Sequence, residues 1–538
     1  MRLPSAHIDT FCRDNLPPAG QWPELLFGLP ELRYPERLNC AEALLDAAVA
    51  RHGADRPCLL TGSETWTYGD LLRRANQIAG VLAEDLGLVP GNRVLLRGPN
   101  GPWLVAAWFA VLKAGGVAVT TMHLLRAGEI AALAARTEPD LVVCDHRYTA
   151  DVEAALPGVP AVVYGGGSGD DLIGRSEARS PDFAAVATAA DDVALLAPTS
   201  GTTGIPKITA HFHRDVLAIN DTFGRHVLAA RPDDVFTGTP PLGFTFGLGG
   251  LVVFPLSAGA AVVLMERATP DGLADLIVDH DVTTVFTAPT MYRALLATGK
   301  GRALTSLRTC VSAGEHLPAT VWRDFHAETG LEIVDGIGCT ELLHIFISAA
   351  PDRIRPGSTG RVVPGFEAAV LDEEGRPVPD GVAGRLAVKG PTGCRYLGDD
   401  RQRGYVAGGW NITGDTYVRD ADGYFWYQAR SDDMIVSAGY KIAGPEVEQA
   451  LVRHPDVLEA GVVGAPDPLR QMIVKAYVVL RDGASPGPEK AAELQDFAKR
   501  TIAPYKYPRS IEFVDSLPRT LTGKVQRYLL RESAAGQA

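Results

Sequence analysis

The chain has 538 residues, of which 46% are hydrophobic and 21% are charged, and its formal net charge is -13. This composition is typical of a globular protein with several domains, and it excludes a fibrous or largely disordered chain. An acidic chain without clustered lysines and arginines is a poor partner for nucleic acid, so an anionic ligand must be bound by local dipoles and a few cations.

Cysteine usage and the first residues bear on the compartment. The seven cysteines are scattered and include no Cys-x-x-Cys pair, so we expect neither a disulfide framework nor a zinc site. The N-terminal residues lack a basic segment followed by an apolar core, so no secretory signal is predicted and a cytoplasmic location is expected.

Residues 67–119 alternate between helix and strand patterns. A helical spacing of apolar residues leads into a buried strand at 94–96, and the pair repeats at 103–112 and 117–119. The same alternation returns between residues 275 and 334. It predicts an α/β fold with mainly parallel sheets that helices cover on both faces.

A loop rich in glycine and hydroxyl residues follows the hydrophobic run at 193–197. Its glycines allow the backbone to approach a ligand closely, and its hydroxyls, amides and lysine suit phosphate oxygens. The spacing differs from that of the Walker P-loop, so we interpret it as another kind of ATP loop. The residues expected to contact ATP here are Thr199, Ser200, Gly201, Thr202, Thr203, Gly204 and Lys207.

Residues 244–265 carry no charge and are long enough in principle to cross a bilayer. Glycines and Pro255 interrupt the stretch, so we interpret it as buried strands or short helices that line a pocket. No membrane partner is therefore expected.

The pattern changes towards the C-terminus. From Gly357 short strands alternate with turn signals, which predicts a β-rich subdomain, and beyond Arg430 helix and strand patterns predict a compact α+β unit.

Three further motifs resemble those of one family in order and spacing. They are Asp335-Gly-Ile-Gly-Cys-Thr-Glu341, residues 411–415 with 430–433, and residues 518–524. Together with the glycine-rich loop they resemble the adenylate-forming superfamily of acyl-CoA synthetases, peptide-synthetase adenylation domains and luciferases, over nearly the whole chain. The resemblance implies a large N-terminal domain, residues 1–431, and a small mobile C-terminal domain, residues 432–538, with the hinge at Asp432.

The resemblance implies an ATP-dependent acid–thiol ligase. A carboxylate attacks the α-phosphate of ATP to give an acyl-adenylate, and the thiol of coenzyme A then displaces AMP. Lys524 is implied to reach the carboxylate and the α-phosphate, Thr340 to donate to the α-phosphate, and Glu341 to hold Mg²⁺. The pantetheine tunnel is implied to involve Ser437, Gly439 and Tyr440.

The nucleoside has its own expected contacts. Asp415 matches the aspartate that takes the ribose hydroxyls, while Arg430 either contacts ribose or phosphate or forms a surface ion pair with Asp432 or Asp433. An aromatic residue often stands in the family where this chain has Ile337, so adenine is expected on an aliphatic face. The residues expected around adenine are Gly314, Glu315, Asp335, Gly336 and Ile337.

Small residues beside aromatic ones suit a flat ring better than a long alkyl chain in the acyl pocket. His344 either reaches the carboxylate or a ring substituent, or is a structural residue. The string at 337–346 resembles benzoate-type CoA ligases, and residues 6–25 resemble 2-aminobenzoate-CoA ligases, so an aryl acid is implied. The expected pocket residues are Phe244, Phe246, Gly247, Ala313, Ile337, Gly338, His344 and Ile345.

Two other functions stay open from the sequence. The same motifs serve an aryl-acid adenylating enzyme that loads the phosphopantetheine of a carrier protein. A non-catalytic nucleotide-binding or scaffolding protein is the third possibility, and the presence of Lys524, Glu341 and Asp415 weighs against it.

Overall fold

The computed structural model describes residues 4–199, 206–430, 433–437, 440–467, 471–502, 506–519, 523 and 525–536. The chain divides into two compact units, one formed by Met1–Ala368 with Val388–Asn411 and the other by Ala369–Ala387 with Ile412–Ala538. Asp432, the expected hinge, lies outside the described residues, so a domain boundary at this position stays a prediction.

One sheet of the first unit is parallel except at one edge. Its strands are β3 (Arg93–Gly98), β4 (Val117–Met122), β5 (Leu141–Asp145), β6 (Ala161–Tyr164), β7 (Val193–Thr199) and β8 (Lys207–Phe212). Their order is β6-β5-β3-β4-β7-β8, and only the pair β7–β8 is antiparallel among these described strands. This sheet confirms the parallel arrangement that residues 67–119 predict.

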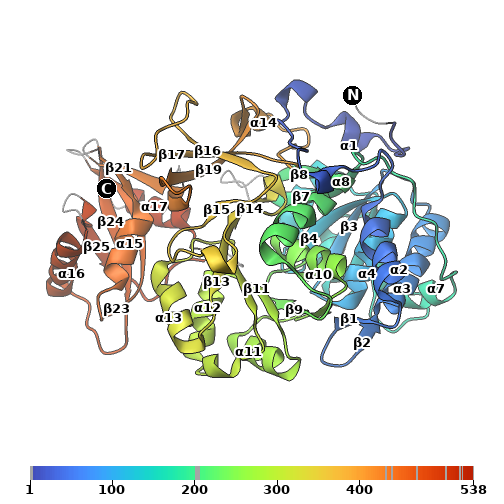
Figure 1. Cartoon of the computed structure of the whole chain (residues 1–538), viewed down its shortest axis with the longest axis horizontal. Helices are drawn as coiled ribbons and strands as arrows, with labels where there is room; N and C mark the ends of the chain where they lie inside the picture. Colours follow the sequence, from blue (N-terminus) through green and yellow to red (C-terminus); the bar gives the residue numbers. More distant parts are fainter. Residues whose placement is uncertain are drawn as a thin grey trace. The chain divides into compact units, whose positions relative to one another are not determined.

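Helices accompany this sheet where the sequence predicts them. Helix α3 (Tyr68–Gly80) begins with a capping box, in which Thr67 accepts from the backbone of Asp70 and the Asp70 carboxylate accepts from the backbone of Thr67. Figure 1 shows α3 beside α4 (Pro102–Lys113), whose residues are nearly all buried. Further helices of this part are α5 (Ala127–Thr137), α6 (Thr149–Ala155), α7 (Leu172–Glu177) and α8 (His213–Ile219).

A second, larger sheet completes the α/β part of this unit. Its strands are β1 (Pro57–Leu60), β2 (Thr65–Thr67), β9 (Val235–Gly238), β10 (Ala261–Val263), β11 (Thr284–Thr287), β12 (Thr309–Ser312), β13 (Ile333–Gly338), β14 (Ile345–Ser348) and β15 (Arg361–Val362). The order is β15-β14-β13-β12-β11-β9-β10-β1-β2, parallel from β13 to β1 and antiparallel at both edges. Helices α11 (Pro270–Asp279), α12 (Pro289–Ala297) and α13 (Ala319–Thr329) bury apolar side chains against it.

The uncharged stretch forms a helical run in the core. Helix α9 (Thr245–Leu248), a π-helical turn (Gly249–Val253) and α10 (Phe254–Ala258) follow one another without a break. Pro255, expected to interrupt the stretch, instead lies inside this run. In the wider π turn the Phe254 N–H donates to the carbonyl of Gly249, five residues back, and this widening accommodates the proline ring. Within the described residues, none of the helices combines the length and the apolar composition that crossing a bilayer requires.

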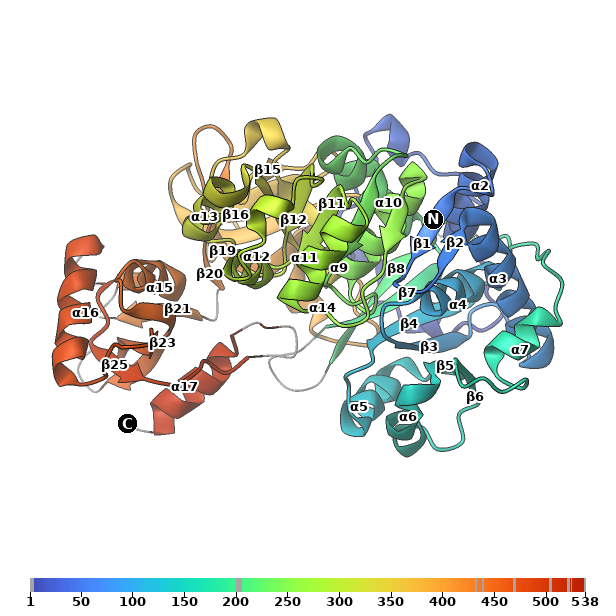
Figure 2. The ribbon, with the colours of Figure 1, turned by 90° about the horizontal axis from the view of Figure 1, so that it is seen from below.

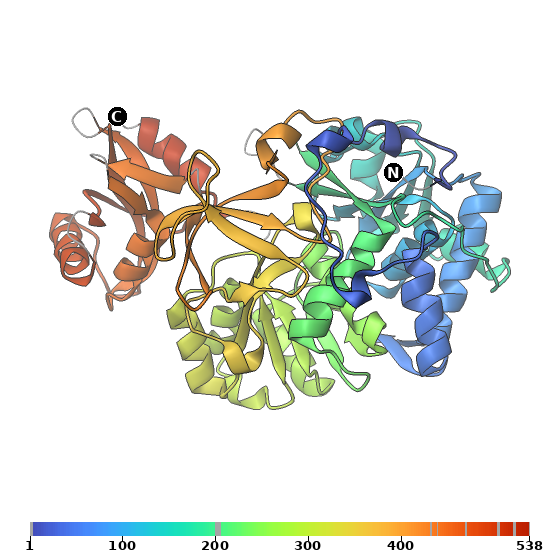
Figure 3. The same cartoon turned by 45° about the horizontal axis from the view of Figure 1, so that its top comes forward.

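The N-terminal segment, dark blue in Figure 3, runs past the orange segment around residue 400. Leu25 forms a parallel bridge with Gly390, and the backbone N–H of Glu24 donates to the carbonyl of Gly409. At the start of helix α14 (Gln402–Tyr405), the Gln402 side chain donates to the carbonyl of Gln21 and accepts from the backbone N–H of Tyr396. These bonds fix the position of the backbone at Tyr396.

Residues 367–430 form the expected short strands. They are β16 (Glu367–Leu371), β17 (Ala383–Lys389), β18 (Val406–Ala407), β19 (Trp410–Arg419) and β20 (Phe425–Arg430), in the order β16-β17-β19-β18 with β20 paired to β19.

The C-terminal residues form the expected α+β unit. Its elements are β21 (Met434–Ser437), β22 (Tyr440–Ala443), α15 (Gly444–Val452), β23 (Val457–Asp467), β24 (Gln471–Leu480), α16 (Pro488–Thr501), β25 (Ser510–Phe513) and α17 (Arg527–Gly536). Figure 2 shows α15 and α16 near the sheet β23-β24-β25, where Val447 and Leu494 pack against Val462. On the other face of this sheet, Leu530 of α17 and Val463 belong to a second apolar cluster. Successive residues of β23 therefore point into two different cores, one on each face of the sheet.

Candidate active site

The expected ATP loop joins two paired strands. Thr199 ends β7 and Lys207 begins β8, and the two residues are partners across the antiparallel pair. Ser200, Gly201, Thr202, Thr203 and Gly204 lie outside the described residues, so their contacts stay a prediction.

Lys207 reaches Glu341 through a buried tyrosine. The Lys207 ammonium donates to the Tyr396 hydroxyl at 2.8 Å, and this hydroxyl donates to Glu341 Oε1 at 2.5 Å. Lys207 Nζ itself lies 3.8 Å from Glu341 Oε1. The structure therefore brings together a cation and a carboxylate that the sequence assigned to phosphate and Mg²⁺.

A buried polar network holds the turn that carries Thr340 and Glu341, a 3-10 turn formed by Thr340–Leu342 after β13. His211 Nε2 lies 2.8 Å from the carbonyl of Thr340, and a carbonyl only accepts, so the imidazole donates. Burial lowers the pKa of His211 to about 4, so the ring is neutral at pH 7. Close by, the fully buried pair Arg395–Asp215 has Nη1 and Oδ2 2.7 Å apart.

Leu343 has a strained backbone between Glu341 and His344. Its φ is +70° and its ψ is -38°, although the residue is not glycine and its side chain is buried. Such a conformation costs about 1–3 kcal/mol and persists only where the surrounding structure fixes it.

His344 lies inside a cluster of aromatic rings. Its ring centroid is 4.7 Å from that of Phe254 and 5.6 to 6.4 Å from those of Phe223, Phe246 and Phe286. Burial lowers the pKa of His344 to about 3, so it is neutral at pH 7 and offers one donor and one acceptor. The backbone of Phe246 lies close enough to interact with the imidazole, but neither ring nitrogen makes a well-formed hydrogen bond among the described residues. This imidazole is therefore a hydrogen-bonding group in an apolar setting, and it supplies no cation.

The other expected acyl-pocket residues lie on the segments around this cluster. Phe244, Phe246 and Gly247 are in or next to α9, Ala313 follows β12, and Ile337, Gly338 and Ile345 are on β13 and β14. A methyl group built on Gly249, in the π turn after α9, would lie 2.3 Å from His344 Cδ2. A glycine at this position therefore leaves the space that the imidazole needs.

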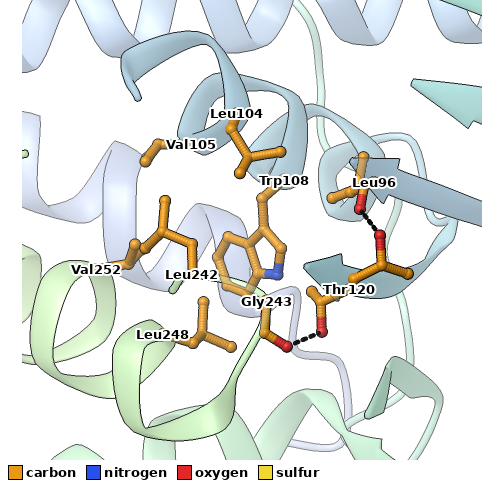
Figure 4. Close-up of a pocket in the computed structure, with 10 residues that line it drawn as sticks. Leu96, Leu104, Val105, Trp108, Thr120, Leu242, Gly243, Leu248 and Val252 are labelled. Atoms are coloured by element: carbon orange, nitrogen blue, oxygen red, sulfur yellow. Dashed lines mark hydrogen bonds between the residues drawn. The ribbon is translucent and has the colours of Figure 1, made fainter. Parts of the chain in front are cut away.

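Figure 4 shows a separate cavity lined by α4 and by residues near α9, among them Trp108, Leu242, Leu248 and Val252. Its volume is about 20 Å³, room for about one water molecule. This cavity is too small for an aromatic ring, so it is not the acyl site.

The expected adenine residues lie at the ends of neighbouring parallel strands. Ser312 of β12 and Asp335 of β13 are partners in register, and Gly314 has a φ of +90° that suits glycine. Burial raises the pKa of Asp335 well above its usual value. Glu315 accepts a hydrogen bond from Thr290 at 2.8 Å, while Gly336 and Ile337 continue β13.

In the second unit, Asp415 and Arg430 are cross-strand partners on β19 and β20. Arg430 Nη1 lies 3.1 Å from Asp415 Oδ1, so Arg430 contacts the aspartate that is expected to bind the ribose hydroxyls. Asp433, one of the alternative partners considered for Arg430, pairs with Arg531. Ser437 is buried at the end of β21, and Tyr440 begins β22. Gly439, Asp432 and Lys524 lie outside the described residues.

Among the described residues, one group of potential metal ligands is formed by His454, Asp456 and Glu493. Lys490 already pairs with Asp456 at 2.5 Å and with Glu493 at 2.6 Å, so these carboxylates have a cation. Glu341, by contrast, is a single buried carboxylate 3.8 Å from Lys207. This arrangement fits Mg²⁺, which takes one or two carboxylates together with phosphate oxygens.

The sequence matches two family models, "AMP-binding enzyme" over residues 45–396 and "AMP-binding enzyme C-terminal domain" over residues 446–524. The chain belongs to the family of AMP-binding, adenylate-forming enzymes. It is 34% identical to the benzoate–CoA ligase of Thauera aromatica over 514 residues, covering 94% of this chain and 98% of that protein.

Solved structures agree with this membership. The anthranilate CoA ligase AuaEII in complex with anthranoyl-AMP matches with a TM-score of 0.88 and 34% identity, covering 94% of this chain and 99% of that chain. The benzoate CoA ligase from Burkholderia xenovorans LB400 matches with a TM-score of 0.84 and 34% identity, covering 92% of this chain and 99% of that chain. The protein is an AMP-forming acyl-CoA ligase, as the sequence predicted.

The sequence patterns did not indicate several residues of the ligase's candidate site. Tyr396 lies in a stretch without a recognised motif, and the aromatic partners of His344 look like ordinary core residues on separate elements. The missed residues are His211, Phe223, Phe254, Phe286, Arg395 and Tyr396.

Proposed function

We propose that the ligase converts an aromatic carboxylic acid, 2-aminobenzoate or a related benzoate, into its CoA thioester through an acyl-adenylate. The observation that carries this proposal is the neutral imidazole of His344 within a cluster of phenylalanine rings. Flat apolar walls favour a flat ring, and one neutral polar group beside them suits a substituent such as an amine. The benzoate and anthranilate ligases named among the relatives support the same class of acid.

In the first step a carboxylate oxygen attacks the α-phosphorus of ATP, forming an O–P bond while the bond to pyrophosphate breaks. Both partners are anionic, so the site must offset their repulsion with cations and donors. Lys207 and Lys524 supply cations and Thr340 supplies a donor. Glu341 would hold Mg²⁺, which when bound neutralises phosphate charge.

The nucleoside would be bound at its base and at its ribose. Adenine lies against Gly314, Glu315 and Asp335–Ile337, and Asp415 takes the ribose hydroxyls with Arg430 beside it.

In the second step the thiolate of CoA attacks the acyl carbon, and the bond from that carbon to the oxygen of AMP breaks. The C-terminal domain rotates at Asp432 between the steps, withdrawing Lys524 and presenting Ser437, Gly439 and Tyr440 to pantetheine. Gly439, which has no side chain, would leave room for this narrow arm.

A substrate panel tests the proposal. Benzoate, its 2-, 3- and 4-substituted forms and short fatty acids are assayed for AMP formation, once with CoA and once with a phosphopantetheinylated carrier protein. The proposal expects CoA-dependent AMP formation with aryl acids, 2-aminobenzoate among the best. Activity with the carrier protein in place of CoA would instead identify a loading enzyme, and preference for fatty acids would reject the aryl pocket.

A further inference from the structure

The geometry around Tyr396 points to a role in the site that rests on the proposed function. Lys207 has only protons to donate, so at 2.8 Å the Tyr396 hydroxyl accepts from it. The hydroxyl's own proton is then directed to Glu341 Oε1, 2.5 Å away. The tyrosine therefore forms one bond to the cation and one to the anion.

The two charged groups themselves do not form a hydrogen bond. Lys207 Nζ and Glu341 Oε1 are 3.8 Å apart, whereas a direct bond between an ammonium and a carboxylate is about 2.7–2.9 Å long. Both side chains are largely shielded from water, with 22% of Lys207 and 10% of Glu341 exposed. Opposite charges in such a setting attract strongly. A group that bonds to both of them can therefore prevent a direct hydrogen bond between the ammonium and the carboxylate.

Tyr396 is held firmly enough to act as this group. Its side chain is fully buried, and its ring packs edge-on against Tyr405 with centroids 5.6 Å apart. Its backbone pairs with Thr209, two residues after Lys207 in β8, and its N–H donates to Gln402. The hydroxyl therefore cannot follow the charged groups if they move.

We propose that Tyr396 is a positioning residue whose hydroxyl keeps Lys207 and Glu341 apart, so that both charges stay available to magnesium-bound ATP. A direct ion pair would direct each charge at the other. Lys207 could then no longer bind the phosphates, and Glu341 could no longer bind the metal. The hydroxyl bonds to one face of each group, and the two charges stay 3.8 Å apart without a direct hydrogen bond between them.

The first test is calorimetric titration of Tyr396→Phe with ATP in the presence of Mg²⁺. Removing the hydroxyl lets Lys207 and Glu341 pair directly, so the Kd is expected to rise about tenfold, the usual effect of losing a bond to a charged group. The Mg²⁺ concentration for half-maximal pyrophosphate exchange rises as well, while thioester formation from supplied acyl-AMP changes less than twofold. Tyr405→Phe is the matched control, because its hydroxyl contacts Cys339 Sγ at 3.3 Å, and it should keep the Kd.

A double variant separates positioning from general packing. In a Lys207→Met background the cation that would pair with Glu341 is absent, so Tyr396→Phe should change the Kd less than twofold. Equal effects of Tyr396→Phe in both backgrounds would overturn the inference, as would a wild-type Kd for the single variant.

Folding is checked by thermal melting. If Tyr396→Phe does not fold, 4-aminophenylalanine at position 396 retains the ring and a donor to Glu341 but accepts poorly from Lys207. Its Kd for magnesium-bound ATP should still exceed that of the wild type, and an unchanged Kd would reject the role. Failure of the wild type itself to adenylate aryl acids would concern the proposed function and not Tyr396.

Discussion

Asp415 and Arg430 face each other across the antiparallel pair of β19 and β20, with Arg430 Nη1 3.1 Å from Asp415 Oδ1. The guanidinium thus orients a carboxylate that we expect to accept both ribose hydroxyls. Asp415→Asn replaces one acceptor oxygen by a donor, so the KM for ATP should rise about 10- to 100-fold.

The measurement is pyrophosphate exchange with ATP and with 2′-deoxy-ATP. The wild type should prefer ATP, and Asp415→Asn should lose most of this preference. Asp422→Asn, on the exposed turn between the same strands, is the control and should keep it. A variant with unchanged preference would remove Asp415 from the ribose site.

Lys524→Ala should greatly slow acyl-adenylate formation, because one aimed charge in such a site is worth on the order of 3 kcal/mol, or ~100-fold in rate. Thioester formation from supplied acyl-AMP should stay largely intact, since we propose that the lysine is withdrawn in the second step. Adenylation at a near-normal rate would exclude Lys524 from this role.

Asp432→Pro should give the opposite pattern, because proline fixes φ at the expected hinge without touching the ATP site. Adenylation should persist while thioester formation slows. Equal slowing of both half-reactions would show that the hinge, and the domain boundary with it, lie elsewhere.

Burial of His344 predicts how stability depends on pH. Its pKa is lowered to about 3, whereas an unfolded histidine titrates near 6.5, so the unfolded chain binds more protons between these values. The neutral ring's contribution is fully present above pH 6.5 and is lost as the pH falls towards 3. His344→Phe removes this term, so between pH 7 and pH 5 the variant should lose about 2 kcal/mol less stability than the wild type.

Urea unfolding at several pH values measures this difference. His326→Phe, at an exposed position on α13, serves as the control. Parallel pH profiles of His344→Phe and the wild type would contradict the account of His344 as a buried neutral ring.

The sequence predicted those parts of the fold that local patterns determine. Helix α3 follows from its apolar spacing, and the alternation of helix and strand predicted the parallel sheets. The helical run through Pro255 was not predicted, because the π turn that accommodates the proline has no pattern of its own.

In the candidate site, too, the residues in local motifs were predicted and those defined by distant contacts were not. Glu341 and His344 were found because they stand in a recognised motif. Tyr396 and Phe286 were not found, because their importance comes from contacts with residues far along the chain. Such contacts depend on how the sheets assemble, and no local spacing encodes them.

The most direct test of the central claim is catalytic efficiency, kcat/KM, for CoA-thioester formation from 2-aminobenzoate, benzoate and octanoate. An apolar pocket discriminates single small groups by roughly 1 to 3 kcal/mol, so 2-aminobenzoate should be used best, benzoate more slowly, and octanoate least. A kcat/KM for octanoate above those for both aryl acids would contradict the aryl pocket while leaving the adenylation chemistry unaffected.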